Sequence, residues 1–279
     1  MDKKRGKLLE KVLSKRKTKF KKICQDIKQL KVQGAESVAI AGLKAYSLMP
    51  TKKAEKILLS LRATEPALKN ALLHAKKFSV ARALKHFKNS EEKTNKLIFK
   101  IIKNNSIIFT HCHSSTVVQG LIYAKKHGRK FSVFNTETRP LFQGRKTAKE
   151  IAKAGIKVTT MVDSAARQEI NNADMMIIGA DAILSNGNAV NKIGSGMFAE
   201  IAFYHKIPVY VATDSWKFSR QKVKIEERNY REIWKNVPKA VKIKNPAFEF
   251  VEAKHIKAII SELGILKPHQ FTKKAKIVL

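Results

Sequence analysis

Residues 106–114 read SIIFTHCHS, and residues 175–181 read MMIIGAD. Each stretch is a short apolar run that stops at reactive side chains, with Cys112 following the first run and Asp181 following the second. Short runs that are apolar on both faces are typical of buried parallel strands. In open α/β sheets the ligand crevice lies just beyond the carboxyl ends of such strands. The two stretches therefore predict a thiol and a carboxylate at one sheet edge, as a candidate acid–base pair.

Strands and helices alternate from about residue 105 onward. We expect strands over 106–110, 130–135, 156–162, 175–179 and 207–212, and helices over 114–126, 147–154, 165–171 and 193–204. Strands joined by helices of this length imply a right-handed parallel sheet. Its five strands would deliver polar groups to one rim.

Residues 1 to about 100 show only the spacing of helices. Helices are expected over 8–30, 36–48 and 51–61, from Pro66 onward, and from a cap at 89–92 toward Lys103. The predicted fold class is α/β, with an N-terminal helical domain (1–104) followed by a Rossmann-like parallel-sheet domain (105–279).

The chain of 279 residues carries a formal net charge of +35. Such an excess indicates an acidic partner, either nucleic acid or a phosphorylated small molecule, or else a general bias toward lysine. Because the lysines are spread along the chain and no nucleic-acid-binding motif is found, we favour the bias, and nucleic acid is not an expected partner. The apolar runs are too short to span a bilayer, so no membrane partner is expected. Two cysteines outside any CxxC motif indicate reduced thiols in a cytoplasm.

Cys112 has two interpretations. If a helix starts at Ser114, its positive end favours a thiolate at Cys112, and His111 and His113 would lower the thiol pKa further if either were protonated. The alternative is an inert buried cysteine. The polar surroundings favour a functional thiol.

Asp181 follows an uninterrupted apolar strand, where partial desolvation would raise its pKa and make it an acid near neutrality. The alternative is a turn or cap aspartate. Asn191 and Lys192 are expected to open a helix, where Lys192 and the free helix N–H groups would hold a phosphate. Arg139, just ahead of Pro140, is a second phosphate candidate whose alternative is a solvated loop arginine.

Nucleotide motifs are absent from the sequence. Gly179 and Gly194 do not form a GxGxxG fingerprint, and there is no P-loop. The adjacent residues His111, Cys112 and His113 are a weak metal signal. We therefore expect no metal and no organic cofactor.

Several motifs then occur in a familiar order. They are THCHS at 110–114, TETRP at 136–140, DSAA at 163–166, GAD at 179–181 and NKIG at 191–194, followed by NPAF at 245–248 and LGILKP at 263–268. The sequence resembles the family that contains methylthioribose-1-phosphate isomerase, archaeal ribose-1,5-bisphosphate isomerase and the alpha, beta and delta subunits of translation initiation factor 2B. The residues within these motifs are most similar to those of the ribose-1,5-bisphosphate isomerase branch.

The resemblance implies roles for individual residues. The cysteine and aspartate of the family's isomerases fall on Cys112 and Asp181, and the initiation-factor alpha subunit typically lacks both. Weaker matches in the helical region add Gln33, Gly34, Ala35 and Arg62 to the expected substrate-binding residues. The family isomerases carry an arginine that contacts phosphate where this chain has Gln33, which removes a bidentate anion clamp. A further departure is Ala63, at a position where proline is usual.

The expected function is an aldose–ketose isomerase that converts ribose 1,5-bisphosphate to ribulose 1,5-bisphosphate in nucleotide salvage. Asp181 would handle hydroxyl protons and Cys112 the carbon-bound proton. Arg139, Lys192 and Arg62 would neutralise phosphate, while Asn191 would hold a sugar hydroxyl. The alternative is a regulatory protein similar to the initiation-factor subunits, which binds a protein partner or a nucleotide or sugar phosphate without turnover. The resemblance also implies a homo-oligomer, either a dimer or a hexamer built from dimers.

Overall fold

The computed structural model describes residues 2–62 and 65–279, without the side chains of residues 2–9. By its backbone contacts the chain divides into two compact units, a first unit up to Lys88 and a second from Asn89 to Leu279. The expected domain boundary after residue 104 stays a prediction. Among the helices described, none is both long enough and apolar enough to cross a bilayer.

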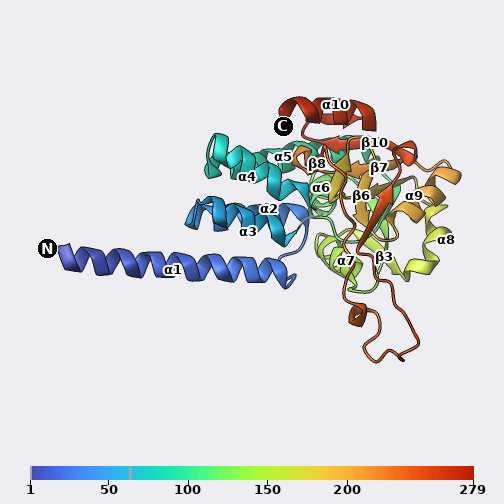
Figure 1. Ribbon diagram of the computed structural model, residues 1–279. Coiled ribbons are helices and arrows are strands. Elements are labelled where there is room, and N and C mark those ends of the chain that lie inside the picture. The colour runs from blue at the N-terminus through green and yellow to red at the C-terminus, as the bar shows by residue number, and fades with distance from the viewer. Residues whose placement is uncertain (1, 63–64) are drawn as a thin grey trace. The chain divides into compact units, whose positions relative to one another are not determined.

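The first unit is helical, as the sequence predicts. Its elements are α1 (Asp2–Lys28), α2 (Ala35–Leu48), α3 (Lys52–Leu61) and α4 (Pro66–Lys77), with the start of α5 (Val80–Ile101) (Figure 1). Thr51 caps α3 by accepting a hydrogen bond from the Ala54 N–H at 3.2 Å. Helices α2 and α4 pack so closely that a Cβ on Gly42 would lie 2.2 Å from Leu68 Cδ1.

One predicted helix start is wrong. Residues 89–92 do not cap a helix, because α5 runs through them without a break. The Ser90 hydroxyl, which lies within this stretch, donates to Glu262 Oε2 at 3.0 Å. Ala83, Phe87 and Ile98 are buried along this helix at helical spacing. Helix α5 is therefore packed on both sides of the helix start that was predicted at residues 89–92.

The second unit is built on a mostly parallel sheet, which confirms the predicted fold class. The main sheet has the strand order β11-β10-β7-β4-β1-β2-β3. Its strands are β1 (Ser106–Thr110), β2 (Phe131–Thr136), β3 (Lys157–Met161), β4 (Met175–Ile178), β7 (Val209–Ala212), β10 (Ile256–Ser261) and β11 (Gly264–Leu266). Only β11 runs antiparallel to its neighbour. The carboxyl ends of β1 and β4 are adjacent, because these two strands pair in parallel.

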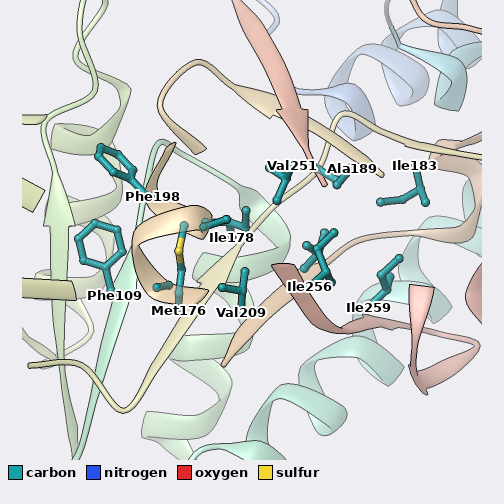
Figure 2. Close-up of a cluster of buried hydrophobic side chains, with 14 of the residues drawn as sticks. Phe109, Met176, Ile178, Ile183, Ala189, Phe198, Val209, Val251, Ile256 and Ile259 are labelled. Atoms are coloured by element: carbon teal, nitrogen blue, oxygen red, sulfur yellow. The ribbon is translucent and has the colours of Figure 1, made fainter. Parts of the chain in front are cut away.

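Helices cover both faces of this sheet. They are α6 (Ser115–Lys126), α7 (Gln143–Lys153), α8 (Ala166–Ile170), α9 (Ser195–Tyr204) and α10 (Pro268–Val278). Successive residues of β1 point to opposite faces, so Ile108 packs with α6 residues such as Leu121, and Phe109 packs with Phe198 of α9. Figure 2 shows Phe109 and Phe198 at one end of the cluster of buried side chains to which both belong.

Beside the main sheet lies a smaller one that the sequence analysis missed. It has the order β8-β5-β6-β9 and consists of β5 (Ala182–Leu184), β6 (Ala189–Lys192), β8 (Phe218–Ser219) and β9 (Phe248–Val251). Short 3₁₀ turns complete the unit: η1 (Asp163–Ala165), η2 (Ser215–Lys217), η3 (Tyr230–Glu232) and η4 (Ala253–His255). The turn chemistry at residues 185–188 closes the antiparallel hairpin of β5 and β6. Asn191 and Lys192 therefore end a strand, and the expected helix begins only at Ser195.

Two further elements differ from prediction at their first residues. Helix α7 begins at Gln143, four residues earlier than expected, and Gly144 is required there because a Cβ would lie 1.7 Å from the Thr136 carbonyl oxygen. Helix α8 begins at Ala166, one residue later than expected, and Asp163 lies in the 3₁₀ turn that precedes it. The Asp163 carboxylate accepts hydrogen bonds from the backbone after β2, as described below.

Substitution of Phe198 tests the packing of α9 on the sheet. Phe198 is 1% exposed and lies 5.7 Å from the Phe109 ring, between centroids. We expect Phe198→Ala to lower the free energy of unfolding by about 3–5 kcal/mol, because a buried ring is lost and a cavity remains. The control is Phe203→Ala on the same helix, where the ring is 56% exposed and the loss should be below about 0.5 kcal/mol. Urea unfolding measures both, and equal losses would contradict this account of the core.

Candidate active site

The backbone at Cys112 is held in an uncommon conformation. Its φ is +66°, in the left-handed region that residues other than glycine adopt rarely. Two threonines fix it: the Cys112 N–H donates to Thr138 Oγ1 at 3.0 Å, and the Thr147 hydroxyl donates to the Cys112 carbonyl at 2.8 Å. Strained backbone persists only where the surroundings hold it, and such positions cluster at functional sites. The thiol is therefore presented from a fixed main chain just beyond β1.

His111 is a buried, neutral imidazole. Its Nε2 lies 2.9 Å from the Ile193 carbonyl oxygen and acts as the donor, while Nδ1 accepts from the Thr136 hydroxyl at 2.5 Å. Burial lowers the pKa of His111 to about 4. His111 therefore links the ends of β1 and β2 to the segment between β6 and α9.

Neither flanking histidine carries the positive charge that would lower the pKa of Cys112. Burial also lowers the pKa of His113, whose Nδ1 lies 3.1 Å from Thr147 Oγ1. Both imidazoles are thus neutral near pH 7, and the condition under which they would lower the thiol pKa is not met. Their Nδ1 atoms and the His111 Nε2 atom are occupied by protein hydrogen bonds, which gives no support to a metal site on these rings.

The Cys112 thiol is protonated at neutral pH. Burial raises its pKa to about 11, and the charges of Asp181 and Asp163 raise it further, while Lys192 lowers it. The expected thiolate at Cys112 is therefore wrong. The charges of Asp181 and Lys192 both act on the Cys112 thiol, so these two side chains lie near the sulfur.

Asp181 stands at the end of β4, next to the loop that carries Cys112. The two loops touch, since a Cβ on Gly179 would lie 2.5 Å from Ser114 Oγ. The Asp181 N–H donates to the Val190 carbonyl at 2.8 Å, and Lys217 Nζ donates to the Ala180 carbonyl at 2.8 Å. These bonds fix the backbone on both sides of the carboxylate, whose catalytic role stays a prediction.

Lys192 is a buried cation beside this region. It is 6% exposed, its Nζ lies 5.1 Å from the centroid of the Phe248 ring, and it has no ion pair with any residue that the structure describes. The neighbouring Asn191 donates from Nδ2 to Ser195 Oγ at 2.8 Å. A buried lysine without a carboxylate partner is costly and favours an anionic ligand.

The N-terminus of α9 is not free to bind phosphate, contrary to expectation. Glu249 Oε1 accepts the Gly196 N–H at 2.6 Å. Burial raises the pKa of Glu249, while the backbone N–H groups of Gly196, Gly194 and Met197 lower it. A side-chain carboxylate thus occupies the helix N–H groups that were expected to bind a phosphate together with Lys192.

Arg139 lies on an exposed, anchored loop. Its guanidinium lies 4.9 Å from the Phe142 ring centroid. The backbone N–H groups of Thr138 and Arg139 donate to the two carboxylate oxygens of Asp163, at 2.9 and 2.7 Å. The side chain is thus accessible while its main chain is fixed, which fits the expected phosphate role.

The remaining predicted residues belong to the first unit. Gln33 is exposed and donates from Nε2 to the Leu30 carbonyl at 2.9 Å, and Gly34 has a φ of +86° at the N-cap of α2. Ala35 is the buried first residue of that helix. Arg62 is ion-paired with Glu65, and both side chains are buried. Ala63, also noted from the sequence, lies outside the described residues. A substrate-binding role for these positions stays a prediction.

Sequence reasoning missed the residues that support the site. Thr136 and Thr138 lie within the quoted motif at 136–140, and Asp163 lies within the motif at 163–166, but none of the three was assigned a role. No signal in the sequence pointed to Thr147 or Lys217. Threonine hydroxyls that fix neighbouring main chain carry no local pattern.

Taken together, the fold and the site define a class: a Rossmann-type α/β protein with helices at its N-terminus and reactive side chains beyond the carboxyl ends of β1 and β4. The chain belongs to the Initiation factor 2 subunit family, whose model matches residues 21–268. This confirms the resemblance drawn from the motifs.

Individual relatives agree with this assignment. The chain is 33% identical to ribose 1,5-bisphosphate isomerase of Thermococcus kodakarensis, over 88% of this chain and 90% of that protein. It is 35% identical to ribose 1,5-bisphosphate isomerase of Methanocaldococcus jannaschii, over 89% and 92%. Among solved structures, translation initiation factor eIF-2B of Pyrococcus horikoshii matches with a TM-score of 0.81 and 25% identity, over 90% of this chain and 98% of that one.

The raised thiol pKa can be tested by alkylation. In a Cys24→Ser background, we expect the rate of Cys112 modification by iodoacetamide to rise with pH up to about 11, because only the thiolate reacts. Lys192→Met should slow the reaction at pH 9, since the buried positive charge lowers the thiol pKa. Lys146→Met is the control, a lysine outside the groups that act on the thiol. A midpoint near the ordinary cysteine value of about 8.5 would contradict the assigned protonation state.

Proposed function

We propose that this chain is a sugar-phosphate isomerase that converts ribose 1,5-bisphosphate to ribulose 1,5-bisphosphate in nucleotide salvage. The supporting observation is that a thiol and a carboxylate stand on touching loops beyond β1 and β4, beside the buried Lys192. The identity of about a third to proteins named for this reaction, over nearly the whole of both chains, supports the same substrate.

The reaction requires the transfer of two kinds of proton, those bound to oxygen and those bound to carbon. The ring form of an aldose 1-phosphate opens when an acid protonates the ring oxygen as its bond to C1 breaks. Loss of the C2 proton then gives an enol phosphate, and protonation at C1 with loss of the C2 hydroxyl proton gives the ketose. Asp181 gives the ring-oxygen proton and takes the hydroxyl proton. Cys112 takes the C2 proton and returns it at C1, so both groups end in their starting states.

This scheme requires the pair to hold one proton in the reactive arrangement. Cys112 must be a thiolate at the moment when Asp181 is a carboxylic acid. The thiol must therefore first transfer its proton to the Asp181 carboxylate. The positive charge of Lys192 favours the thiolate. It also stabilises the negative charge that develops on the enol phosphate. Arg139 would neutralise a phosphate from its anchored loop, and Asn191 would hold a sugar hydroxyl.

A second candidate is a regulatory protein that binds a phosphorylated ligand or a protein partner without turnover. Gln33 favours it, because an amide replaces the expected phosphate-binding arginine. The overall likeness to the Pyrococcus horikoshii initiation-factor structure is compatible with it. Incubation of the purified chain with ribose 1,5-bisphosphate separates the two, since only an isomerase produces the ketose. The expected homo-oligomer also stays a prediction, which light scattering can test.

Replacement of either member of the pair should abolish turnover but not binding. We expect Cys112→Ser and Asp181→Asn each to lower kcat by about 10²–10⁴, because each removes a proton-transfer group. Calorimetric titration with ribose 1,5-bisphosphate should still detect binding. Cys24→Ser is the matched control and should keep the full rate. An undiminished rate in Cys112→Ser would remove the thiol from the mechanism.

Solvent deuterium distinguishes proton transfer from a hydride shift. If Cys112 carries the proton from C2 to C1, exchange with solvent during its lifetime on sulfur should place deuterium at C1 of the ketose formed in D₂O. Proton NMR of the product measures this. Product that contains no solvent deuterium would favour the direct hydride shift between the two carbons.

A further inference from the structure

Helix α1 carries a segment that packs against nothing in the described structure. Residues 10–19 are all exposed, a run of ten consecutive helical positions. Burial on this helix begins only at Phe20 and includes Ile27, and α1 contacts α2 and α3. Within the first unit, the N-terminal part of α1 extends beyond the ends of α2 and α3 (Figure 1). About three helical turns therefore lack tertiary support.

The same segment is strongly cationic. Helix α1 as a whole contains twelve Lys and Arg residues against three Asp and Glu residues. Lys11, Lys15 and Lys19 follow one another at i, i+4 spacing and form a row on one helix face, about 12 Å long at about 1.5 Å per residue. None of the three has an ion pair among the residues that the structure describes.

This row is unfavourable for an isolated helix. Like charges at i, i+4 destabilise a helix, and a segment without tertiary packing has little to offset the cost. A polyanion that lies along the row would remove the repulsion. The sequence analysis assigned the charge to a general bias because lysines are spread along the chain, whereas the structure gathers several on one unpacked segment of a helix.

The composition of the segment favours a nucleic acid over a membrane. A helix that lies in a bilayer interface needs a wide apolar face. The exposed segment offers only Val12 and Leu13, which are 41% and 53% exposed, and Arg16 follows them on the same side of the helix. The phosphates of a duplex instead present closely spaced negative charges and require no apolar contact.

We propose that the exposed segment of α1, residues 10–19, binds the phosphate backbone of double-stranded nucleic acid through the row Lys11, Lys15 and Lys19. Binding is independent of base sequence, because lysine contacts to phosphate carry no sequence information. DNA and RNA duplexes share this chemistry, and the experiment below compares them. The proposal is independent of the isomerase activity, since none of these residues belongs to the candidate active site.

The test uses the full chain and fluorescence anisotropy with a short DNA duplex and an RNA duplex of the same sequence. The test variant carries Lys11→Gln, Lys15→Gln and Lys19→Gln. The control carries Lys235→Gln, Lys239→Gln and Lys242→Gln, three exposed lysines of the second unit that remove the same charge. Glutamine has nearly the helix propensity of lysine, so α1 should be retained, and circular dichroism checks this.

Each lost phosphate contact reduces the magnitude of the slope of log K against log salt by about 0.9. For the three substitutions of the test variant this magnitude should fall by about 2.7. The variant should then bind on the order of a hundredfold more weakly at about 0.15 M salt. The control should change affinity less than about threefold. The duplex with the higher affinity identifies the natural class. Equal losses in both variants, or no duplex binding by the unmodified chain, would overturn the proposal. So would binding to phosphatidylserine–phosphatidylcholine vesicles without binding to either duplex.

Discussion

The hydrogen bonds of one buried imidazole hold the candidate site together. His111 donates to the Ile193 carbonyl and accepts from the Thr136 hydroxyl, so a single ring joins β1, β2 and the segment that precedes α9. Its low pKa keeps it neutral, which preserves one donor and one acceptor at neutral pH. Phe198 packs edge-on against the same ring, with 4.9 Å between centroids. The position of Cys112, the next residue along the chain, follows from this arrangement.

Opposing electrostatic effects meet at the thiol. Desolvation and nearby carboxylates favour the neutral form of Cys112, while Lys192 favours the anion. A phosphorylated ligand would add negative charge close to Lys192 and weaken its effect on the sulfur. The fraction of Cys112 present as thiolate would therefore depend on how strongly the bound ligand reduces the electrostatic effect of Lys192 on the sulfur. Glu249 adds a further constraint, because it already occupies the N–H groups at the start of α9.

Five strands of the main sheet, β1 to β4 and β7, were predicted from sequence because the central ones are continuous apolar runs, as at residues 106–110 and 175–178. The edge strands β10 and β11 were not predicted. Such runs specify burial on both faces, and the order of strands and helices then places Cys112 and Asp181 at one edge. The hairpin of β5 and β6 was not predicted, because Asn191 and Lys192 read as the start of a helix. The cap at 89–92 failed for a related reason: Ser90 has a distant partner, Glu262, which local patterns do not reveal.

Protonation states were the least predictable property. They depend on the burial of single atoms, which residue type does not specify, and so the expected thiolate at Cys112 was wrong. The protonated state of Cys112 has a chemical consequence of its own. Peroxides attack thiolates rather than thiols, so a cysteine with a pKa of about 11 forms sulfenic acid slowly. The same burial that keeps the thiolate scarce thus protects the sulfur from oxidative loss between turnovers.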